Sequence, residues 1–228
     1  MNFDYIEKNF KELSKEIRDL AEKQGREVTL VSVTKSGSDE ELCALAAAGA
    51  FDIGENRPGE LRRRGELLKE KGFTPRLHEI GNLQRNKVKL IIETVSLIHS
   101  LDNIALAKEI DKQAKKIGRR IPVLIEINSA KEEQKDGVFP EDAEAFLYEV
   151  KQLPNISVCG LMTMGPVVSN PEMIRPYFRL TKELFDRLNR VCSFEGEGIL
   201  SMGMSDSYRV AVEEGSTLVR IGRRLFKK

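Results

Sequence analysis

The chain has 228 residues, enough to bury the core of one large domain. Its 37 Lys and Arg residues balance 36 Asp and Glu residues, so no global charge bias points to nucleic acid or to an anionic membrane. No apolar stretch reaches the roughly 18 residues of a membrane-spanning helix, and the N-terminus lacks a signal-peptide pattern. The three cysteines lie far apart in the sequence, which predicts a reduced cytoplasmic protein without a disulfide scaffold or zinc site.

The first half of the chain alternates between helix and strand patterns. Apolar residues spaced by three or four predict a helix over residues 3–23, and a β-branched run predicts a buried strand over 29–35. Ser38 followed three residues later by Glu41 is the signature of a capping box, which begins a helix. The other elements predicted in this half are strands at 51–53, 76–80 and 96–100 and helices at 56–71, 83–93 and 103–117.

The second half continues the alternation. The run at 121–127 is almost continuously apolar, as expected for a parallel strand covered on both faces. The later elements are strands at 156–161, 198–200 and 216–221 and helices at 141–152, 171–190 and 205–214. Eight strand–helix alternations predict a (β/α)8 TIM barrel that forms a single domain over 1–228. A doubly wound open sheet is the alternative, because periodicity does not show closure.

Lys35 ends the first apolar strand. An amine at that position is costly unless it is solvated, paired or used chemically. Partial burial would lower its pKa, and a neutral amine can form a Schiff base with an aldehyde. The alternative is a surface lysine that extends out of the strand end.

The segment 201–206 has the features of an anion site. It joins a predicted strand to a predicted helix, with Ser205 or Asp206 as the expected N-cap. Gly203 allows close backbone approach, and the first N–H groups of the helix favour an anion. Gly222 offers a similar backbone after the last strand, and loops after strands seven and eight commonly bind phosphate in such barrels. The alternative is a capped helix and a turn glycine without a ligand.

A phosphate site beside an isolated strand-end lysine predicts a phosphorylated aldehyde as the ligand. Pyridoxal 5′-phosphate (PLP) meets both requirements, with its aldehyde on Lys35 and its phosphate on the last two loops. Arg220 would then face the pyridine nitrogen and keep it unprotonated. A salt bridge at the barrel end is the alternative role for Arg220, and an ordinary sugar phosphate is the alternative ligand.

The same segments resemble the YggS/PROSC family, the pyridoxal phosphate homeostasis proteins. The first reads Val-Thr-Lys, the second Gly-Glu-Asn and the last Gly-Ser-Thr-Leu-Val-Arg-Ile-Gly. The matching stretches are 33–35, 54–56, 78–87, 127–137, 160–164, 200–206 and 215–222. Each motif alone is modest, but seven in the same order are specific. The chain departs from the family at Arg57, Arg223 and Lys227, which add basic charge at the rim of the pocket.

The resemblance implies a fold-type III PLP barrel, similar to that of alanine racemase but without its C-terminal β domain. It implies a Schiff base on Lys35, an asparagine beside the cofactor at Asn56 and an arginine facing the ring nitrogen at Arg220. The cofactor-binding residues expected are Lys35, Asn56, His78, Met162, Ser201, Gly203, Met204, Ser205, Arg220 and Gly222.

We therefore expect a cytoplasmic PLP-binding protein of vitamin B6 homeostasis without efficient turnover; a PLP-dependent amino-acid racemase or lyase is the alternative. Racemisation by two bases needs a second proton acceptor, which alanine racemase takes from a separate domain. Among the tyrosines, only Tyr208 lies near the expected site in sequence, and its helical position favours packing. For His78, organising hydrogen bonds is favoured over acting as a base. The expected partners are PLP, apo-PLP enzymes and small amino acids, with no nucleic acid or membrane, in a monomer or weak homodimer.

Overall fold

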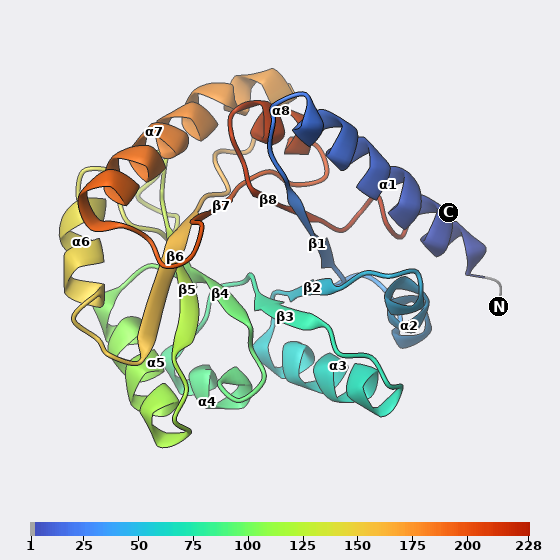
Figure 1. Cartoon of the computed structure of the whole chain (residues 1–228), viewed down its shortest axis with the longest axis horizontal. Helices are drawn as coiled ribbons and strands as arrows, with labels where there is room; N and C mark the ends of the chain where they lie inside the picture. Colours follow the sequence, from blue (N-terminus) through green and yellow to red (C-terminus); the bar gives the residue numbers. More distant parts are fainter. Residues whose placement is uncertain (1–2) are drawn as a thin grey trace.

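A closed barrel of eight parallel strands forms the centre of the molecule in the computed structural model, which describes residues 3–228 (Figure 1). The strands are β1 (Thr29–Val33), β2 (Asp52–Glu55), β3 (Arg76–Glu79), β4 (Leu97–Leu101), β5 (Ile121–Glu126), β6 (Ile156–Met162), β7 (Ile199–Ser201) and β8 (Leu218–Ile221). Neighbours in sequence pair with each other, and β8 pairs with β1. This closure confirms the predicted TIM barrel and excludes the doubly wound open sheet.

Helices surround the barrel, as Figure 1 shows. They are α1 (Asp4–Glu22), α2 (Asp39–Ala47), α3 (Pro58–Glu70), α4 (Val88–Ile91), α5 (Ile104–Lys116), α6 (Ala143–Val150), α7 (Arg175–Cys192) and α8 (Tyr208–Glu213), with the 3-10 turns η1 (Arg85–Lys87) and η2 (Pro171–Ile174). The capping box predicted at Ser38 is confirmed, because its side chain accepts from the Glu41 N–H and Glu41 accepts from the Ser38 N–H. No helix of the described range is long and apolar enough to cross a membrane.

Several predicted helices are shorter than expected; the one predicted over 141–152, for example, spans Ala143–Val150. The helix predicted over 83–93 is reduced to η1 and α4. The chain before it passes close to the end of β2, where a Cβ added at Gly81 would lie 2.3 Å from the Asn56 carbonyl oxygen. The helix predicted from Ser205 begins at Tyr208 instead, with Ser207 as its N-cap. The prediction of Ser205 or Asp206 as the cap was wrong, since both residues belong to the turn that precedes the helix.

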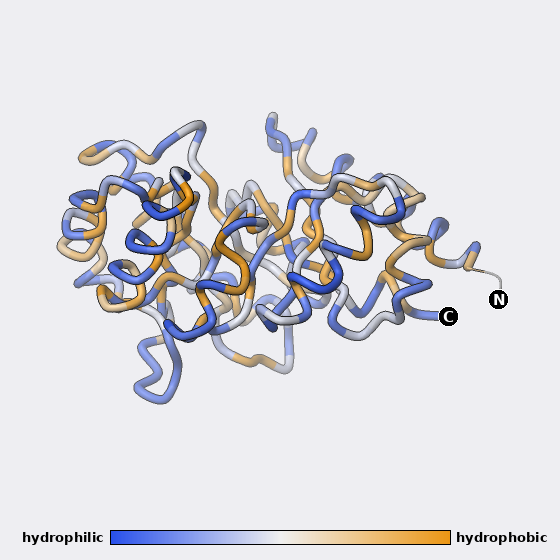
Figure 2. Tube along the Cα trace, turned by 90° about the horizontal axis from the view of Figure 1, so that it is seen from below, coloured by the Kyte–Doolittle hydropathy of each residue, from blue (hydrophilic) through white to orange (hydrophobic). Residues whose placement is uncertain are grey.

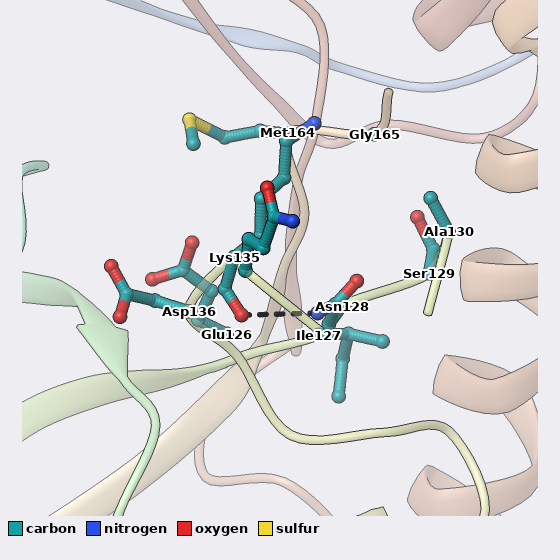
Figure 3. Close-up of a pocket in the computed structure, with 10 residues that line it drawn as sticks. Glu126, Ile127, Asn128, Ser129, Ala130, Lys135, Asp136, Met164 and Gly165 are labelled. Atoms are coloured by element: carbon teal, nitrogen blue, oxygen red, sulfur yellow. Dashed lines mark hydrogen bonds between the residues drawn. The ribbon is translucent and has the colours of Figure 1, made fainter. Parts of the chain in front are cut away.

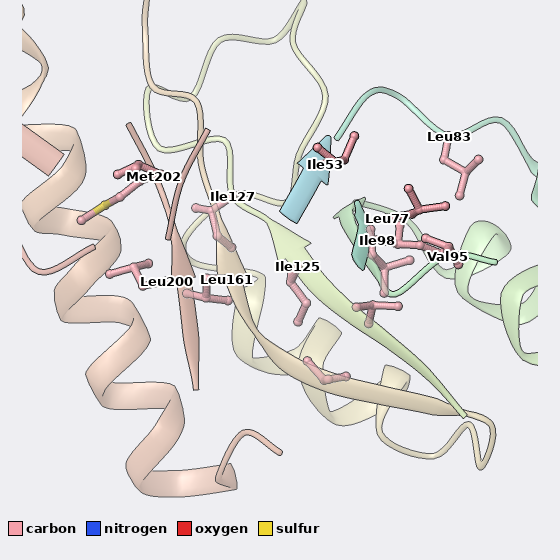
Figure 4. Packing of buried hydrophobic residues seen from close by; sticks show 14 of the residues in the cluster. Ile53, Leu77, Leu83, Val95, Ile98, Ile125, Ile127, Leu161, Leu200 and Met202 are labelled. Atoms are coloured by element: carbon pink, nitrogen blue, oxygen red, sulfur yellow. The ribbon is translucent and has the colours of Figure 1, made fainter. Parts of the chain in front are cut away.

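Inward and outward side chains alternate along the strands. Outward residues such as Ile53, Ile98 and Ile125 pack with the helices in one large cluster, part of which Figure 4 shows. Inward residues such as Val31 and Leu124 form a second, smaller cluster inside the barrel. In Figure 2, hydrophobic and hydrophilic stretches alternate along the trace, as expected for elements with one buried face.

The N-terminal helix completes the outer layer. A helix after β8 would lie between α8 and α2, the helices that follow β7 and β1. In the structure, α1 packs against both α8 and α2 and so occupies that place (Figure 1). The Asn9 side chain fixes the end of the chain there, with its Nδ2 atom 3.1 Å from the Leu225 carbonyl oxygen and 2.8 Å from that of Lys227.

Candidate functional site at the carboxyl end of the barrel

Lys35 lies at the carboxyl end of the barrel, two residues after β1. It follows Val31 by four residues, and Val31 faces the barrel interior. A turn begins at once, because the Gly37 N–H donates to the Thr34 carbonyl oxygen at 2.9 Å. The turn carries Lys35 out to an exposed position. The expected partial burial of the amine was therefore wrong, and the structure presents Lys35 to ligands from solution.

A buried ion pair holds the turn that carries Lys35. The Arg64 guanidinium on α3 donates through Nη2 to the Gly37 carbonyl oxygen at 2.7 Å and through Nη1 to that of Thr34. The same Nη1 lies 2.8 Å from the Glu55 carboxylate, which also accepts from the Thr34 hydroxyl. Both charged side chains are at least nine-tenths buried. The backbone on either side of Lys35 is thus fixed, while its amine remains exposed.

The loops after β7 and β8 lie beside this turn and present free main-chain N–H groups. The Arg220 N–H donates to the Gly203 carbonyl oxygen at 3.0 Å, which joins β8 to the loop after β7. Within residues 3–228, the N–H groups of Gly203, Ser205 and Gly222 have no acceptor. Gly222 also borders the Lys35 segment, since a Cβ added there would lie 2.9 Å from the Val33 carbonyl oxygen. Unpaired N–H groups on adjoining loops are suited to an anion.

Two features of position 203 require glycine. Its φ of +95° is in the left-handed region, and an added Cβ would lie 2.5 Å from the Ala211 Cβ on α8. The family departure at Arg223 is also explained, because its guanidinium pairs with the Asp206 carboxylate across the two loops. Arg57 precedes α3 and is exposed, as is Lys227.

Arg220 is buried inside the barrel, with 4% of its surface exposed. Its Nη1 atom lies 2.5 Å from the Ser201 hydroxyl, and its Nη2 atom lies 3.1 Å from the carbonyl oxygen of Thr163 after β6. Burial lowers the pKa of the guanidinium to about 10, against the attraction of Glu126, so it remains charged at neutral pH. The alternative of a salt bridge at the barrel end is wrong, because Arg220 has neutral hydrogen-bond partners.

A cavity of about 170 Å³ lies at the ends of β5 and β6 (Figure 3). Burial, together with the charge of Asp102, raises the pKa of Glu126 in its wall to about 7. Figure 3 shows the Glu126 and Asp136 carboxylates on the same side of the cavity. The side chain of Asn128 holds the adjoining loop through the carbonyl oxygens of Glu132 and Lys135, at 2.8 Å and 3.2 Å.

The remaining predicted residues lie at different depths. Asn56 and Met204 are exposed at the mouth, and Ser205 is half-buried there. Met162 belongs to the small apolar cluster inside the barrel, and Ser201 is fully buried beneath Arg220. His78 is also buried, and both of its ring nitrogens are hydrogen-bonded, one to Asp52 and one to His99. This arrangement agrees with the organising role expected for His78.

Sequence reasoning missed several residues of this region. The sequence pattern predicts ordinary strand or helix positions for Asp52, His99 and Arg64, and it does not single out the buried carboxyl group of Glu126. One signal was available: the chain has only two histidines, and both lie in predicted strands. Contact between them depends on the pairing of β3 with β4, which a single strand pattern does not reveal.

Comparison with known families decides the classification. The model of the alanine racemase N-terminal domain family matches residues 4–228. The chain belongs to the alanine racemase N-terminal domain family. Within it, the chain is 44% identical over 197 residues to the pyridoxal phosphate homeostasis protein of Aquifex aeolicus, covering 86% of this chain and 85% of that protein. It is 33% identical to the protein of the same name from Helicobacter pylori, covering 88% of each. These matches confirm the resemblance inferred from the motifs.

Solved structures of this family agree with the barrel. PipY of Synechococcus elongatus, solved with PLP bound, is 28% identical to this chain with a TM-score of 0.84. The alignment covers 97% of this chain and 100% of PipY. An alanine racemase of Clostridium difficile is 18% identical with a TM-score of 0.72, and this chain covers 56% of it. The second likeness concerns the fold alone.

Proposed function

We propose that this member of the alanine racemase N-terminal domain family binds PLP at the carboxyl end of its barrel and serves cytoplasmic vitamin B6 homeostasis. One observation carries the proposal: the exposed Lys35 amine and the free N–H groups of Gly203 and Gly222 lie on adjoining segments, close to the buried Arg220 guanidinium. The names of the relatives and the PLP-bound structure of PipY support it.

The donor set of the site fits PLP. PLP supplies an aldehyde that a primary amine captures, a phosphate ester that main-chain N–H groups bind, and a ring nitrogen that accepts a hydrogen bond. Lys35 provides the amine, and its neighbours Thr34 and Gly37 are fixed by Arg64. The loops of Gly203 and Gly222 provide the amides, and Arg220 provides N–H donors that Ser201 and Thr163 do not use.

We propose that the protein binds and delivers PLP and does not act as a racemase or lyase. The described residues form one domain in this proposal. The two residues considered as proton acceptors are engaged elsewhere. The Tyr208 hydroxyl donates to Glu16 at 2.5 Å in the helical layer, and both ring nitrogens of His78 have partners inside the barrel. We further propose that apo-PLP enzymes receive the cofactor and that small amino acids are ligands. We propose a monomer or a weak homodimer.

Titration with PLP tests this function. The native chain should acquire the absorption of protein-bound PLP, with one equivalent retained after dialysis. Lys35→Ala should lose this retention, whereas Lys89→Ala, which removes an exposed lysine on α4, should keep it. Equal retention by Lys35→Ala, or no retention by the native chain, would refute the proposal. Transfer of PLP to an apo-enzyme faster than from free PLP at the same concentration would support delivery.

A further inference from the structure

A continuous line of buried hydrogen bonds runs through the barrel interior from Arg220 to Asp52. Arg220 Nη1 lies 2.5 Å from Ser201 Oγ, which lies 3.0 Å from His99 Nδ1. His99 Nε2 lies 2.9 Å from His78 Nδ1, and His78 Nε2 lies 2.9 Å from Asp52 Oδ1. Each of the five residues is at most 6% exposed.

The line connects the two ends of the barrel. Arg220 lies near the carboxyl end, where its second contact is the carbonyl oxygen of Thr163. Asp52 is the first residue of β2, and its Oδ2 atom lies 2.6 Å from Arg76 Nη2 at the start of β3. The Arg76 side chain is 54% exposed, so the line ends at solvent on the amino-terminal side.

The chemistry of the groups favours one direction for all four bonds. Burial alone would raise the pKa of Asp52, but hydrogen bonds from His78 and Arg76 outweigh it and hold the pKa below its ordinary value. Asp52 is therefore a carboxylate, which only accepts, and His78 Nε2 donates to it. Burial also holds the pKa of His99 well below its ordinary value, so that ring is neutral and carries one proton.

The remaining assignments follow when His78 Nδ1 is the acceptor in its contact with His99 Nε2. His78 Nδ1 accepts from His99 Nε2, and His99 Nδ1 then accepts from the Ser201 hydroxyl. The Ser201 oxygen is left to accept from Arg220. Every donor along the line then meets an acceptor, and Arg220 keeps N–H groups that Ser201 and Thr163 do not use.

We propose that Asp52 is a positioning residue for Arg220, acting through His78, His99 and Ser201. Its carboxylate fixes both imidazole tautomers, and the Ser201 hydroxyl proton is thereby committed to His99. Ser201 and Thr163 then act as two fixed acceptors for the guanidinium and orient its unused N–H groups toward the ring nitrogen of PLP. This inference rests on the proposed function, because PLP is the group toward which Arg220 is oriented.

Nitrogen NMR of the two imidazoles tests the line without PLP. In both rings the proton should lie on Nε2, and Nδ1 should have the shift of an acceptor. In Asp52→Asn, the tautomers of His99 should become mixed, although Asp52 does not touch that ring. A His99 ring protonated on Nδ1 in the native chain, or one unaffected by Asp52→Asn, would overturn the proposal.

The absorption of bound PLP provides a second readout. Asp52→Asn should still capture PLP through Lys35, but the absorption maximum of the bound cofactor should shift and its Kd should rise on the order of five-fold. Asp111→Asn is the matched control, because Asp111 also accepts two hydrogen bonds, from the Asn155 main chain and side chain, but lies on α5 outside the line. It should change neither quantity.

The outcomes separate this inference from the proposed function. A native chain that does not retain PLP refutes the function, whereas the NMR result still reports on the line. Unchanged absorption and Kd in Asp52→Asn would overturn the inference while PLP binding stands. If Asp52→Asn does not fold, Arg76→Gln keeps the buried members in place and removes only the exposed partner of Asp52. It should shift the absorption in the same direction by a smaller amount, and no shift would contradict the proposal.

Discussion

The two sides of the barrel mouth are held by different kinds of contact. On the β1–β2 side, the turn that carries Lys35 depends on the charged side chains of Arg64 and Glu55, both buried. On the β7–β8 side, the proposed anion site consists of main-chain N–H groups, and the ion pair of Arg223 with Asp206 is exposed. Side-chain substitutions should therefore be costly on the first side and mild on the second, where only changes to the backbone path should matter.

Removal of one member of the buried pair should have the largest effect. Arg64→Met leaves Glu55 as a buried charge without its partner, and about 3–5 kcal/mol of unfolding free energy should be lost. Urea unfolding measures this loss, and PLP retention should fall because the Lys35 turn is released. The double variant Arg64→Met/Glu55→Gln should lose less than Arg64→Met alone. A loss below about 1 kcal/mol in Arg64→Met would show that the Arg64–Glu55 pair does not hold the Lys35 turn.

A change to the backbone at Gly203 should cause the second-largest loss of unfolding free energy. Gly203→Ala forces a left-handed φ on alanine and places its Cβ against Ala211, so about 2–4 kcal/mol should be lost, together with the phosphate contacts. Gly72→Ala is the matched control, because Gly72 has a φ of +85° but open space around it. It should show the backbone strain alone. Equal losses in urea unfolding for the two variants would contradict the close packing of the loop on α8.

Stability should also depend on pH through Glu79, a buried acid that is paired with Glu55 across β2 and β3. Burial is the main cause that raises the pKa of Glu79 from 4.5 to about 8. Below about pH 4.5 both the folded and unfolded chains hold the proton; between these values only the folded chain does, so stability falls as pH rises. Glu79→Gln should reduce the fall between pH 5 and pH 8 by about 3 kcal/mol, measured by urea unfolding. An unchanged difference between the two pH values would show that Glu79 ionises normally.

The exposed pair should have the smallest effect. The side chains of Arg223 and Asp206 are 73% and 70% exposed, so Arg223→Ala should change the unfolding free energy by about 0.5 kcal/mol or less. PLP binding should become weaker mainly at low salt, because one positive charge is lost from the rim. A salt-independent loss as large as that in Gly203→Ala would mean that this side chain, and not the backbone, forms the anion site.

The elements and the strand-end residues were predictable because each depends on a local pattern. Lys35, Asn56 and Gly222 follow strands that periodicity identifies, and parallel strands bring such ends to one side. The line from Arg220 to Asp52 was not predictable, since it requires the pairing of β3 with β4 and the closure of the barrel. The position of Lys35 depends on the contact of Arg64 with Thr34, thirty residues away in the sequence, and no local pattern contains that tertiary contact.

Covalent trapping tests the central claim most directly. The native chain is incubated with PLP, reduced with borohydride and digested, and the modified peptide is identified by mass spectrometry. The account predicts one pyridoxyl phosphate per chain, attached to Lys35, with no comparable label in Lys35→Ala. A label on another lysine, or labelling spread over the exposed lysines with none preferred, would contradict it.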